Sequence, residues 1–320
     1  MGYVVILDRP MATSQGFANW ICGPQLIPEF LQYLLLAEAD ALEKFSIGTT
    51  IKTIYYPDLK AFHVCLPPLA EQKRIVALLD EAFAGIDAAK AKAEAKHDLS
   101  QELRESYLES LLTAEDDWTD TTVADCADIS TGFAFKSSGF SDSKNDIRLL
   151  GGDNIIAGAI RWENIRRWPK ADAQNYQGFF LSIDDVVLAM DRPIVNTGLK
   201  VSMISEEDVP ALLIQRTARM RAKADVYPHF LYLTLSSKKF ISYLSSSQKG
   251  VGVPHVSSRQ IGSFGMKLPP MEEQHRIVRL LSDIDAATKA TSRNMARMVN
   301  NLHEIKSSLL SQAFAGELTA

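Results

Sequence analysis

The sequence predicts mixed α/β domains that alternate with long coiled-coil helices, in two tandem repeats of which the first is incomplete. Three observations lead to this fold class. LPPLAEQKRIVALLDEAFAGIDAA (Leu66–Ala89) returns as LPPMEEQHRIVRLLSDIDAATKA (Leu268–Ala290). Apolar residues follow each Pro-Pro at alternating spacings of four and three. Short runs rich in Val, Ile and Leu, separated by Gly, Asn and Pro, occupy the region between the repeats.

Shorter matches extend the repeat towards the N-terminus. PEFLQYLLL (Pro28–Leu36) matches PHFLYLTL (Pro228–Leu235), and Gln15 aligns with Gln215. One repeat, Asp116–Ala320, is complete, but about 80 residues that correspond to Asp116–Asn196 have no counterpart in the other. We therefore expect the chain to begin within a repeat.

The repeat predicts four regions. They are residues 1–65, the C-terminal part of a first α/β domain; 66–115, a first spacer helix; 116–267, a complete second α/β domain; and 268–320, a second spacer helix. Within the complete domain we expect strands at 184–190, 199–204 and 211–222 and a helix at 228–244. A strand is also expected around Gln15, with a helix after it.

Each spacer helix begins after a Pro-Pro pair, because proline is tolerated only in the first turn of a helix. The predicted coiled-coil seam comprises Ile75, Leu79, Ile86, Leu103 and Leu111 in the first helix and Ile277, Leu281, Ile284, Met295, Met298, Leu302, Ile305 and Leu309 in the second. The first helix loses its register at Lys96 and regains it at Leu103, as a stutter does. Matching seams predict an antiparallel pair, in which about 43 residues extend about 65 Å.

Composition is that of a soluble globular protein, with 46% hydrophobic and 23% charged residues. The three cysteines (Cys22, Cys65 and Cys126) form no CxxC motif, which favours a reducing cytosol and a cytoplasmic location. The net charge is −5, yet residues 211–267 hold nine Lys and Arg and a single acid, Asp225. This local excess indicates either a nucleic-acid surface or an ordinary solvated face.

Catalytic motifs are missing from the sequence. No GxxxxGK[ST] loop is present, and the histidines lack HxxxH or HExxH spacing. The LPPL and LPPM tetrapeptides differ from the NPPY/F motif of amino-methyltransferases in the polar residue that holds the target amine. We expect neither a catalytic residue nor a metal site.

The repeated (L)PP-x-x-EQ-x-x-I-V motif, in Leu66–Asp80 and Leu268–Asp283, resembles that of the specificity (S, or HsdS) subunit of Type I restriction–modification systems. The terminal LLSQAFAGELTA (Leu309–Ala320) and the domain entry at Trp118 are also similar, so the resemblance covers essentially the whole chain. It implies a non-catalytic subunit whose two target-recognition domains read a bipartite sequence in double-stranded DNA. It further implies that the paired helices dock modification subunits. The resemblance also implies that S-adenosylmethionine, ATP and Mg are bound by the modification and motor–nuclease partners, so we expect no cofactor in this subunit.

Residues suited to DNA reading occur in predicted loops and turns, because Arg and Lys pair with guanine and Asn and Gln with adenine. The candidates are Lys136, Asn154, Arg166, Arg167, Arg192, Asn196, Gln215, Arg216, Lys249 and His255, together with Gly250 and Gly252, which permit close backbone approach.

Two alternatives stay open: a truncated or silent specificity fragment, or half-subunit, that acts as a homodimer, and a coiled-coil scaffold that binds no DNA. The incomplete domain can be disordered, associate with a second chain, or be complemented by a separately encoded half. We expect residues 116–320 to form a competent half-reader and 1–65 to contribute little base recognition. Recognition domains of similar fold read unrelated sequences, so no DNA target follows.

Overall fold

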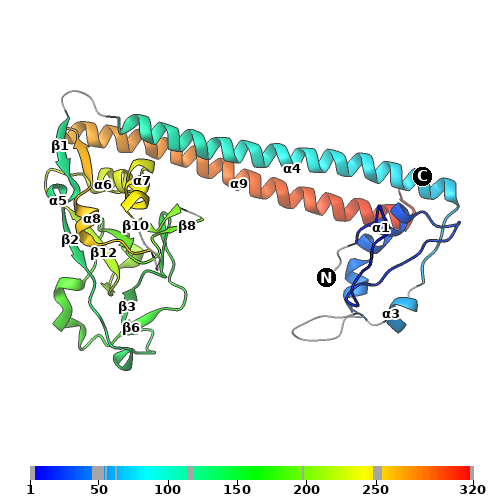
Figure 1. The fold of residues 1–320 in the computed structure, drawn as a ribbon, viewed down its shortest axis with the longest axis horizontal. Helices are drawn as coiled ribbons and strands as arrows, with labels where there is room; N and C mark the ends of the chain where they lie inside the picture. The colour runs from blue at the N-terminus through cyan, green and yellow to red at the C-terminus, as the bar shows by residue number, and fades with distance from the viewer. Residues whose placement is uncertain are drawn as a thin grey trace. The chain divides into compact units, whose positions relative to one another are not determined.

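A computed structural model describes residues 4–44, 54, 56–61, 63–113, 118–196, 198–247 and 254–317 (Figure 1). The chain forms two compact units: unit 1 is Met1–Leu99 with Ala290–Ala320, and unit 2 is Ser100–Lys289. Each unit takes part of the long helices α4 (Leu69–Leu111) and α9 (Met271–Ala315). Neither these nor any other described helix has an apolar stretch long enough to cross a bilayer.

Unit 2 contains the strands. A four-stranded antiparallel sheet has the order β10 (Val201–Met203), β7 (Val186–Ala189), β12 (Thr217–Ala222), β2 (Ala127–Thr131). A three-stranded sheet has the order β11 (Ala211–Leu213), β3 (Ile147–Leu150), β6 (Arg166–Trp168), with β11 and β3 parallel. The two-stranded pairs are β1 (Thr119–Thr122) with β13 (Gly265–Leu268), β4 (Ile155–Ile156) with β5 (Ala159–Ile160), and β8 (Ile194–Val195) with β9 (Gly198–Leu199).

Three predicted elements of unit 2 are interrupted. The strand expected at 199–204 breaks at Lys200, so that Leu199 ends β9 and residues 201–203 form β10 in another sheet. The single strand expected at 211–222 turns at Ile214–Arg216, which places β11 and β12 in different sheets. The helix expected at 228–244 is two helices, α6 (Pro228–Ser236) and α7 (Lys238–Ser247). Between them, the Ser237 hydroxyl accepts a hydrogen bond from Phe240 N at 3.2 Å, as a helix N-cap does. Two short helices, α5 (Val123–Cys126) and α8 (Ser258–Gly262), complete the mixed α/β domain.

Strand β7 is the centre of the unit 2 core, and all four of its side chains are buried. Val186 and Leu188 belong to the cluster that includes Phe230 of α6 and Leu281 of α9. Val187 and Ala189 belong to a second cluster, formed with β3 and β11. Because its side chains alternate between two apolar environments, β7 reads as a continuous apolar run and not as an alternating one.

The described residues of unit 1 form helices and irregular segments, without a strand. Helix α1 (Pro28–Ala37) packs Phe30 and Leu34 against Ile75 and Leu79 of α4 and against Leu310 of α9. Two short helices, α2 (Ala39–Lys44) and α3 (Tyr56–Lys60), follow it.

The strand predicted around Gln15 is wrong. Described residues 4–27 contain no strand, and Gln15 lies in a turn. The aligned residues of unit 2 form β12, which is hydrogen-bonded on both edges, to β7 and to β2. A strand is defined by its partners, and the described residues of unit 1 offer this segment neither of them.

Within each unit, α4 and α9 pair antiparallel, as predicted (Figure 1). The register break at Lys96 is filled by polar contacts. In unit 1 the Ser292 hydroxyl lies 3.2 Å from His97 Nδ1. In unit 2 Ser100 donates to Thr288 Oγ1 at 3.4 Å, and Arg104 pairs with Asp285. The seam therefore continues through the break as polar side chains, which a search for apolar residues misses.

The prediction is wrong for three residues that it placed in the coiled-coil seam. Leu103 is 64% exposed, Met298 41% and Ile305 48%. In α9 the covered stripe follows Leu302, Lys306, Leu310 and Ala313, and the Lys306 ammonium lies 4.4 Å above the Phe83 ring. An α-helix has 3.6 residues per turn, so a strict heptad drifts by about 20° per repeat. After several heptads the covered side has moved by one residue.

A buried glutamine explains why the motif recurs. Gln274 is fully buried: its Oε1 accepts from Tyr227 N at 2.7 Å, and its Nε2 donates to the carbonyls of Asp225 and Pro269 at 3.1 and 2.9 Å. Gln72 makes the same three bonds, to Ile27 N at 2.9 Å and to the carbonyls of Gln25 and Pro67 at 2.8 Å. Each glutamine thus fastens the chain before α1 or α6 to the start of a long helix.

Candidate nucleic-acid interface

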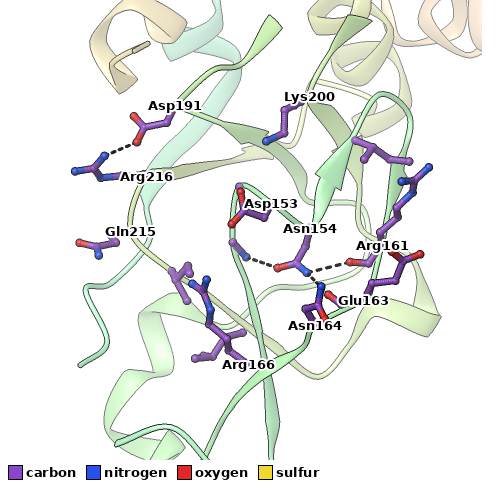
Figure 2. A pocket seen from close by; sticks show the side chains of 15 residues that line it. Asp153, Asn154, Arg161, Glu163, Asn164, Arg166, Asp191, Lys200, Gln215 and Arg216 are labelled. Carbon is purple, nitrogen blue, oxygen red and sulfur yellow. Dashed lines mark hydrogen bonds and ion pairs between the residues drawn. The ribbon is translucent and has the colours of Figure 1, made fainter. Parts of the chain in front are cut away.

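A depression of about 590 Å³ opens on unit 2 between the loop after β3, strand β6 and the turn between β11 and β12 (Figure 2). Four predicted DNA-reading residues line it: Asn154, Arg166, Gln215 and Arg216. They come from three separate segments, which the fold brings together.

The turn that carries Gln215 and Arg216 is held by backbone hydrogen bonds on both sides. Ile214 N donates to Leu150 O at 3.0 Å, and Gln215 N donates to Phe133 O at 2.8 Å. Met190 N donates to Arg216 O at 2.9 Å. The exposed side chains of this turn therefore project from a fixed backbone, as a recognition site requires.

Asp191 gathers two of the predicted residues at one side of the depression. Its carboxylate accepts from Arg216 Nη1 at 2.5 Å and lies 2.6 Å from His255 Nδ1. The neighbouring Arg192 N donates to Pro254 O at 2.8 Å. We call Asp191, Arg192, Arg216 and His255 the Asp191 cluster. Three chain segments that are separated in sequence meet in it.

The Asp191 cluster shows two signs of a constrained site. Arg192 and Arg216 have φ values of 45° and 64°, in the left-handed region that non-glycine residues seldom adopt. Burial opposes ionisation of Asp191, but hydrogen bonds from His255 and Arg216 outweigh it and lower the pKa of the carboxyl. Asp191 is thus an anion that orients the Arg216 guanidinium.

Several polar side chains of the depression have no hydrogen-bond or ion-pair partner among the described residues. They include Gln215, Arg166 and Lys200, and the first two of these are exposed. Burial lowers the pKa of the half-covered Lys200 ammonium, against the attraction of Asp153 and Asp191. The sequence prediction missed Lys200. The one available signal was a lysine between two short apolar strands.

Two candidates have internal roles. Asn154 Oδ1 accepts from Gly151 N at 3.1 Å, and its Nδ2 donates to the carbonyls of Arg161 and Glu163 at 3.0 and 3.4 Å. Both amide hydrogens are used, so Asn154 cannot donate to a base without breaking these bonds. Arg167 Nη1 donates to Asp146 O at 2.8 Å. Both residues support the loops around the depression.

Fewer basic side chains of segment 211–267 are free to bind DNA than its net charge suggests. Arg221 pairs with the buried Asp185, and Arg219 donates to the carbonyls of Gly178 and Phe180. Three more basic residues of the segment are internally paired: Lys223, on the carbonyls of Ala124 and Asp125; Lys238, on Glu105; and Lys267, on Asp120. The partners of these five lie outside the segment, so counting charge within it overstates the free positive charge.

The other candidates are dispersed. Lys136 and Asn196 are exposed and lie outside the depression, Asn196 in the turn between β8 and β9. Lys249, Gly250 and Gly252 lie outside the described residues.

The depression is electrically mixed. Its basic residues are Arg161, Arg166, Lys200 and Arg216, and its acidic residues are Asp153, Glu163 and Asp191, which sum to +1 (+4 and −3). Phosphate contacts call for positive charge, whereas base edges present both donors and acceptors. Arg, Gln and Asp side chains at one fixed surface therefore suit base edges better than a bare phosphate backbone.

The sequence profile described as "Type I restriction modification DNA specificity domain" matches residues 1–96 and 115–296. The specificity subunit of the Type I restriction enzyme EcoAI from Escherichia coli is 36% identical over 154 residues, 48% of this chain and 26% of its own. The MjaVIII specificity subunit from Methanocaldococcus jannaschii is 28% identical over 80% of this chain and 63% of its own. The chain thus spans about a quarter and somewhat under two thirds of these two relatives.

Solved structures show the same fold. A chain from a structure describing complex assembly and conformational transition of the type I R-M system aligns with a TM-score of 0.74 at 20% identity, over 91% of this chain and 71% of that one. The HsdS subunit from Thermoanaerobacter tengcongensis aligns with a TM-score of 0.55 at 20% identity, over 92% of this chain and 71% of its own.

Proposed function

Because the chain belongs to the family of Type I restriction-modification DNA specificity domains, we propose that it is a sequence-reading, non-catalytic subunit of a Type I restriction–modification complex. The observation that carries this proposal is the depression of unit 2. There a rigid turn presents Gln215 and Arg216 beside Arg166 and Lys200. A glutamine pairs with adenine and an arginine with guanine, so this turn suits reading of one half-site in the major groove.

Within this proposal the residues have distinct tasks. The side chains of Gln215 and Arg166 have no hydrogen-bond partner among the described residues, and in this proposal they contact base edges. Asp191 holds Arg216 in one direction, so that its guanidinium meets a base or phosphate without prior reorganisation. Lys200 supplies a partly desolvated positive charge to the phosphate backbone.

The partners follow from the proposed role. Double-stranded DNA binds at the depression, and modification subunits dock on the long helices. Those subunits and the motor–nuclease subunit bring S-adenosylmethionine, ATP and Mg, while this chain holds no cofactor. The proposed location is the cytoplasm, where such a complex meets DNA. A homodimer that reads a palindromic bipartite site stays a prediction, tested by sedimentation of the full chain.

Methylation mapping tests the proposal. The full chain is produced with modification subunits in a host without other adenine methylation, and methylated adenines are mapped. We expect one bipartite sequence. Gln215→Ala should relax the requirement at one base pair, because a bidentate contact is worth about 1–3 kcal/mol of discrimination. Gln174→Ala removes an exposed glutamine of unit 2 that does not line the depression and serves as the matched control, with an unchanged pattern.

Two results would contradict the proposal. Methylation that does not depend on this chain would remove its role as the reader. An unchanged motif in Gln215→Ala, Arg216→Ala and Arg166→Ala together would place base reading outside the depression. If Arg216 contacts a phosphate and no base, its loss leaves the motif intact and lowers the salt slope of DNA binding by about 0.9.

A further inference from the structure

Unit 1 carries an apolar groove of about 460 Å³. Val5, Ile6 and Leu7 line it together with residues 18–22 and with Pro28 and Leu31 of α1. Trp20 is 47% exposed and Ile21 fully exposed. Apolar side chains gathered along a groove at this exposure mark a binding surface.

Unit 2 shows what fills the corresponding groove there. Gln15 aligns with Gln215 and Pro28 with Pro228, each pair 200 positions apart, so residues 17–22 correspond to β12 (217–222). Closer to the N-terminus, Gly2 lines up with Gly198, an offset of 196, so residues 5–7 correspond to β10 (201–203). In unit 2, β7 lies between β10 and β12 and contacts α6, the counterpart of α1. The groove of unit 1 is therefore lined by the counterparts of β10 and β12, the two strands that flank β7 in unit 2.

The backbone that borders the groove is open. Among the described residues, the N–H groups of residues 18–22 have no hydrogen-bond partner, whereas Phe17 N donates to Ser14 O at 3.1 Å. In β12 the aligned residues pair with β7 on one edge and with β2 on the other. Unpaired backbone groups beside exposed apolar side chains are the features to which an added strand binds.

We propose that this groove binds an extended, apolar, β-branched strand equivalent to β7, supplied by a second recognition-domain polypeptide that is not a copy of this chain. The four side chains of β7 (VVLA) show the required chemistry: two face the helix layer and two face the opposite layer. The added strand would hydrogen-bond to residues 17–22 and cover Trp20. This inference goes beyond the proposed function, because the groove and the DNA-reading depression belong to different units.

A second copy of this chain is not the occupant that the structure favours. Its own β7 is fully buried and paired on both edges, so donating that strand would dismantle the sheet of unit 2. A strand that is not already committed to a core is required.

The test uses the full chain and a synthetic peptide with the sequence of residues 183–191 (IDDVVLAMD). Trp20 is the one tryptophan of unit 1, and it lines the groove. Binding should shift tryptophan emission to shorter wavelength with micromolar affinity, because the strand excludes water from the indole. Trp20→Phe should abolish the shift. A peptide with Val187→Pro should bind at least tenfold more weakly, since proline cannot donate to the ladder.

Protein variants locate the binding. Leu7→Asp puts a charge in the groove and should weaken peptide binding at least tenfold. Leu103→Asp is the matched control, on an exposed leucine of α4 in unit 2, and should leave it unchanged. The proposal is overturned by an unchanged emission, by equal binding of the Val187→Pro peptide, or by a dimer of the chain that Leu7→Asp dissociates. That last result would assign the groove to a second copy. DNA binding by the full chain is measured in parallel, and its loss would not affect this outcome.

Discussion

Arg216 shows how one residue obtains its direction. Its backbone adopts φ 64°, its carbonyl accepts from Met190 N, and its guanidinium meets Asp191 at 2.5 Å. An exposed arginine ordinarily samples many rotamers, and ordering them costs up to about 2 kcal/mol. Because the Asp191 carboxylate already restricts the Arg216 side chain in the free protein, part of this entropy is lost before a ligand binds.

The Asp191→Asn variant should distinguish the effect of Asp191 on the orientation of Arg216 from the effect of its negative charge on DNA binding. Removal of a negative charge should strengthen binding to all DNA sequences at low salt. The loss of the anion that orients Arg216 should reduce discrimination between a cognate and a scrambled duplex by about 1–3 kcal/mol. Titration of both duplexes at several salt concentrations measures the two effects. Asp153→Asn, in the same depression, should raise general affinity and leave discrimination unchanged. Equal discrimination in both variants would contradict a positioning role for Asp191.

At the scale of elements, the two long helices pack against each other within each unit, and sequence periodicity identifies only some of the side chains in this contact. Ile277 and Leu281 are buried as predicted, but Met298 and Ile305 are exposed. The covered stripe of α9 follows the pitch of the helix and not a strict heptad.

The drift of this stripe is measurable. Leu281→Ala should destabilise unit 2 by about 2–5 kcal/mol, because it empties a buried site. Ile305→Ala should change the free energy of unfolding by about 0.5 kcal/mol or less, as an exposed site does. Urea unfolding followed by circular dichroism compares the variants. If both variants lost the same free energy of unfolding, Ile305 would lie in the seam and the strict heptad would be correct.

The buried glutamine that recurs as Gln72 and Gln274 leads to a second prediction about the helices. Gln274→Ala leaves Tyr227 N and two carbonyls unpaired in a buried place, which should cost about 1–3 kcal/mol or more. Thermal unfolding of the full chain measures the loss. Gln174→Ala, at an exposed position of the same unit, is the control and should change stability little. If the two variants melt alike, the glutamine bonds do not hold the helices together.

At the scale of the whole molecule, the aligned segments 17–22 and 217–222 have opposite surroundings. The second is the central strand β12, whereas the N–H groups of the first lack partners among the described residues from Ala18 onwards. Similar positions in a repeat therefore have different local stability.

Hydrogen exchange should show this difference directly. In the full chain the amides of residues 18–22 should exchange orders of magnitude faster than those of residues 218–222, because only the latter are in a paired, buried sheet. Mass spectrometry of peptic peptides makes the comparison within one sample. Comparable protection of both segments would mean that residues 17–22 are already paired in solution.

Much of the fold was predictable because its signals are local. The Pro-Pro pairs set the start of both long helices, and the apolar run at 186–189 indicated a strand that is indeed buried. Of the candidate site, Gln215, Arg216 and Arg166 were chosen by residue type and lie in one depression. Lys200 and Asp191 were missed, since their importance depends on neighbours that sequence order does not reveal.

By itself, the sequence determined the repeat, the antiparallel pairing of two long helices and the mixed α/β class, because periodicity and proline act within a few residues. Only the tertiary structure decided that Ile214–Arg216 is a turn, that Asp191 joins Arg216 to His255, and that residues 17–22 form no strand. These outcomes depend on hydrogen-bond and ion-pair partners many positions away. Such partners are set by which segments the fold brings together, and no local pattern specifies them.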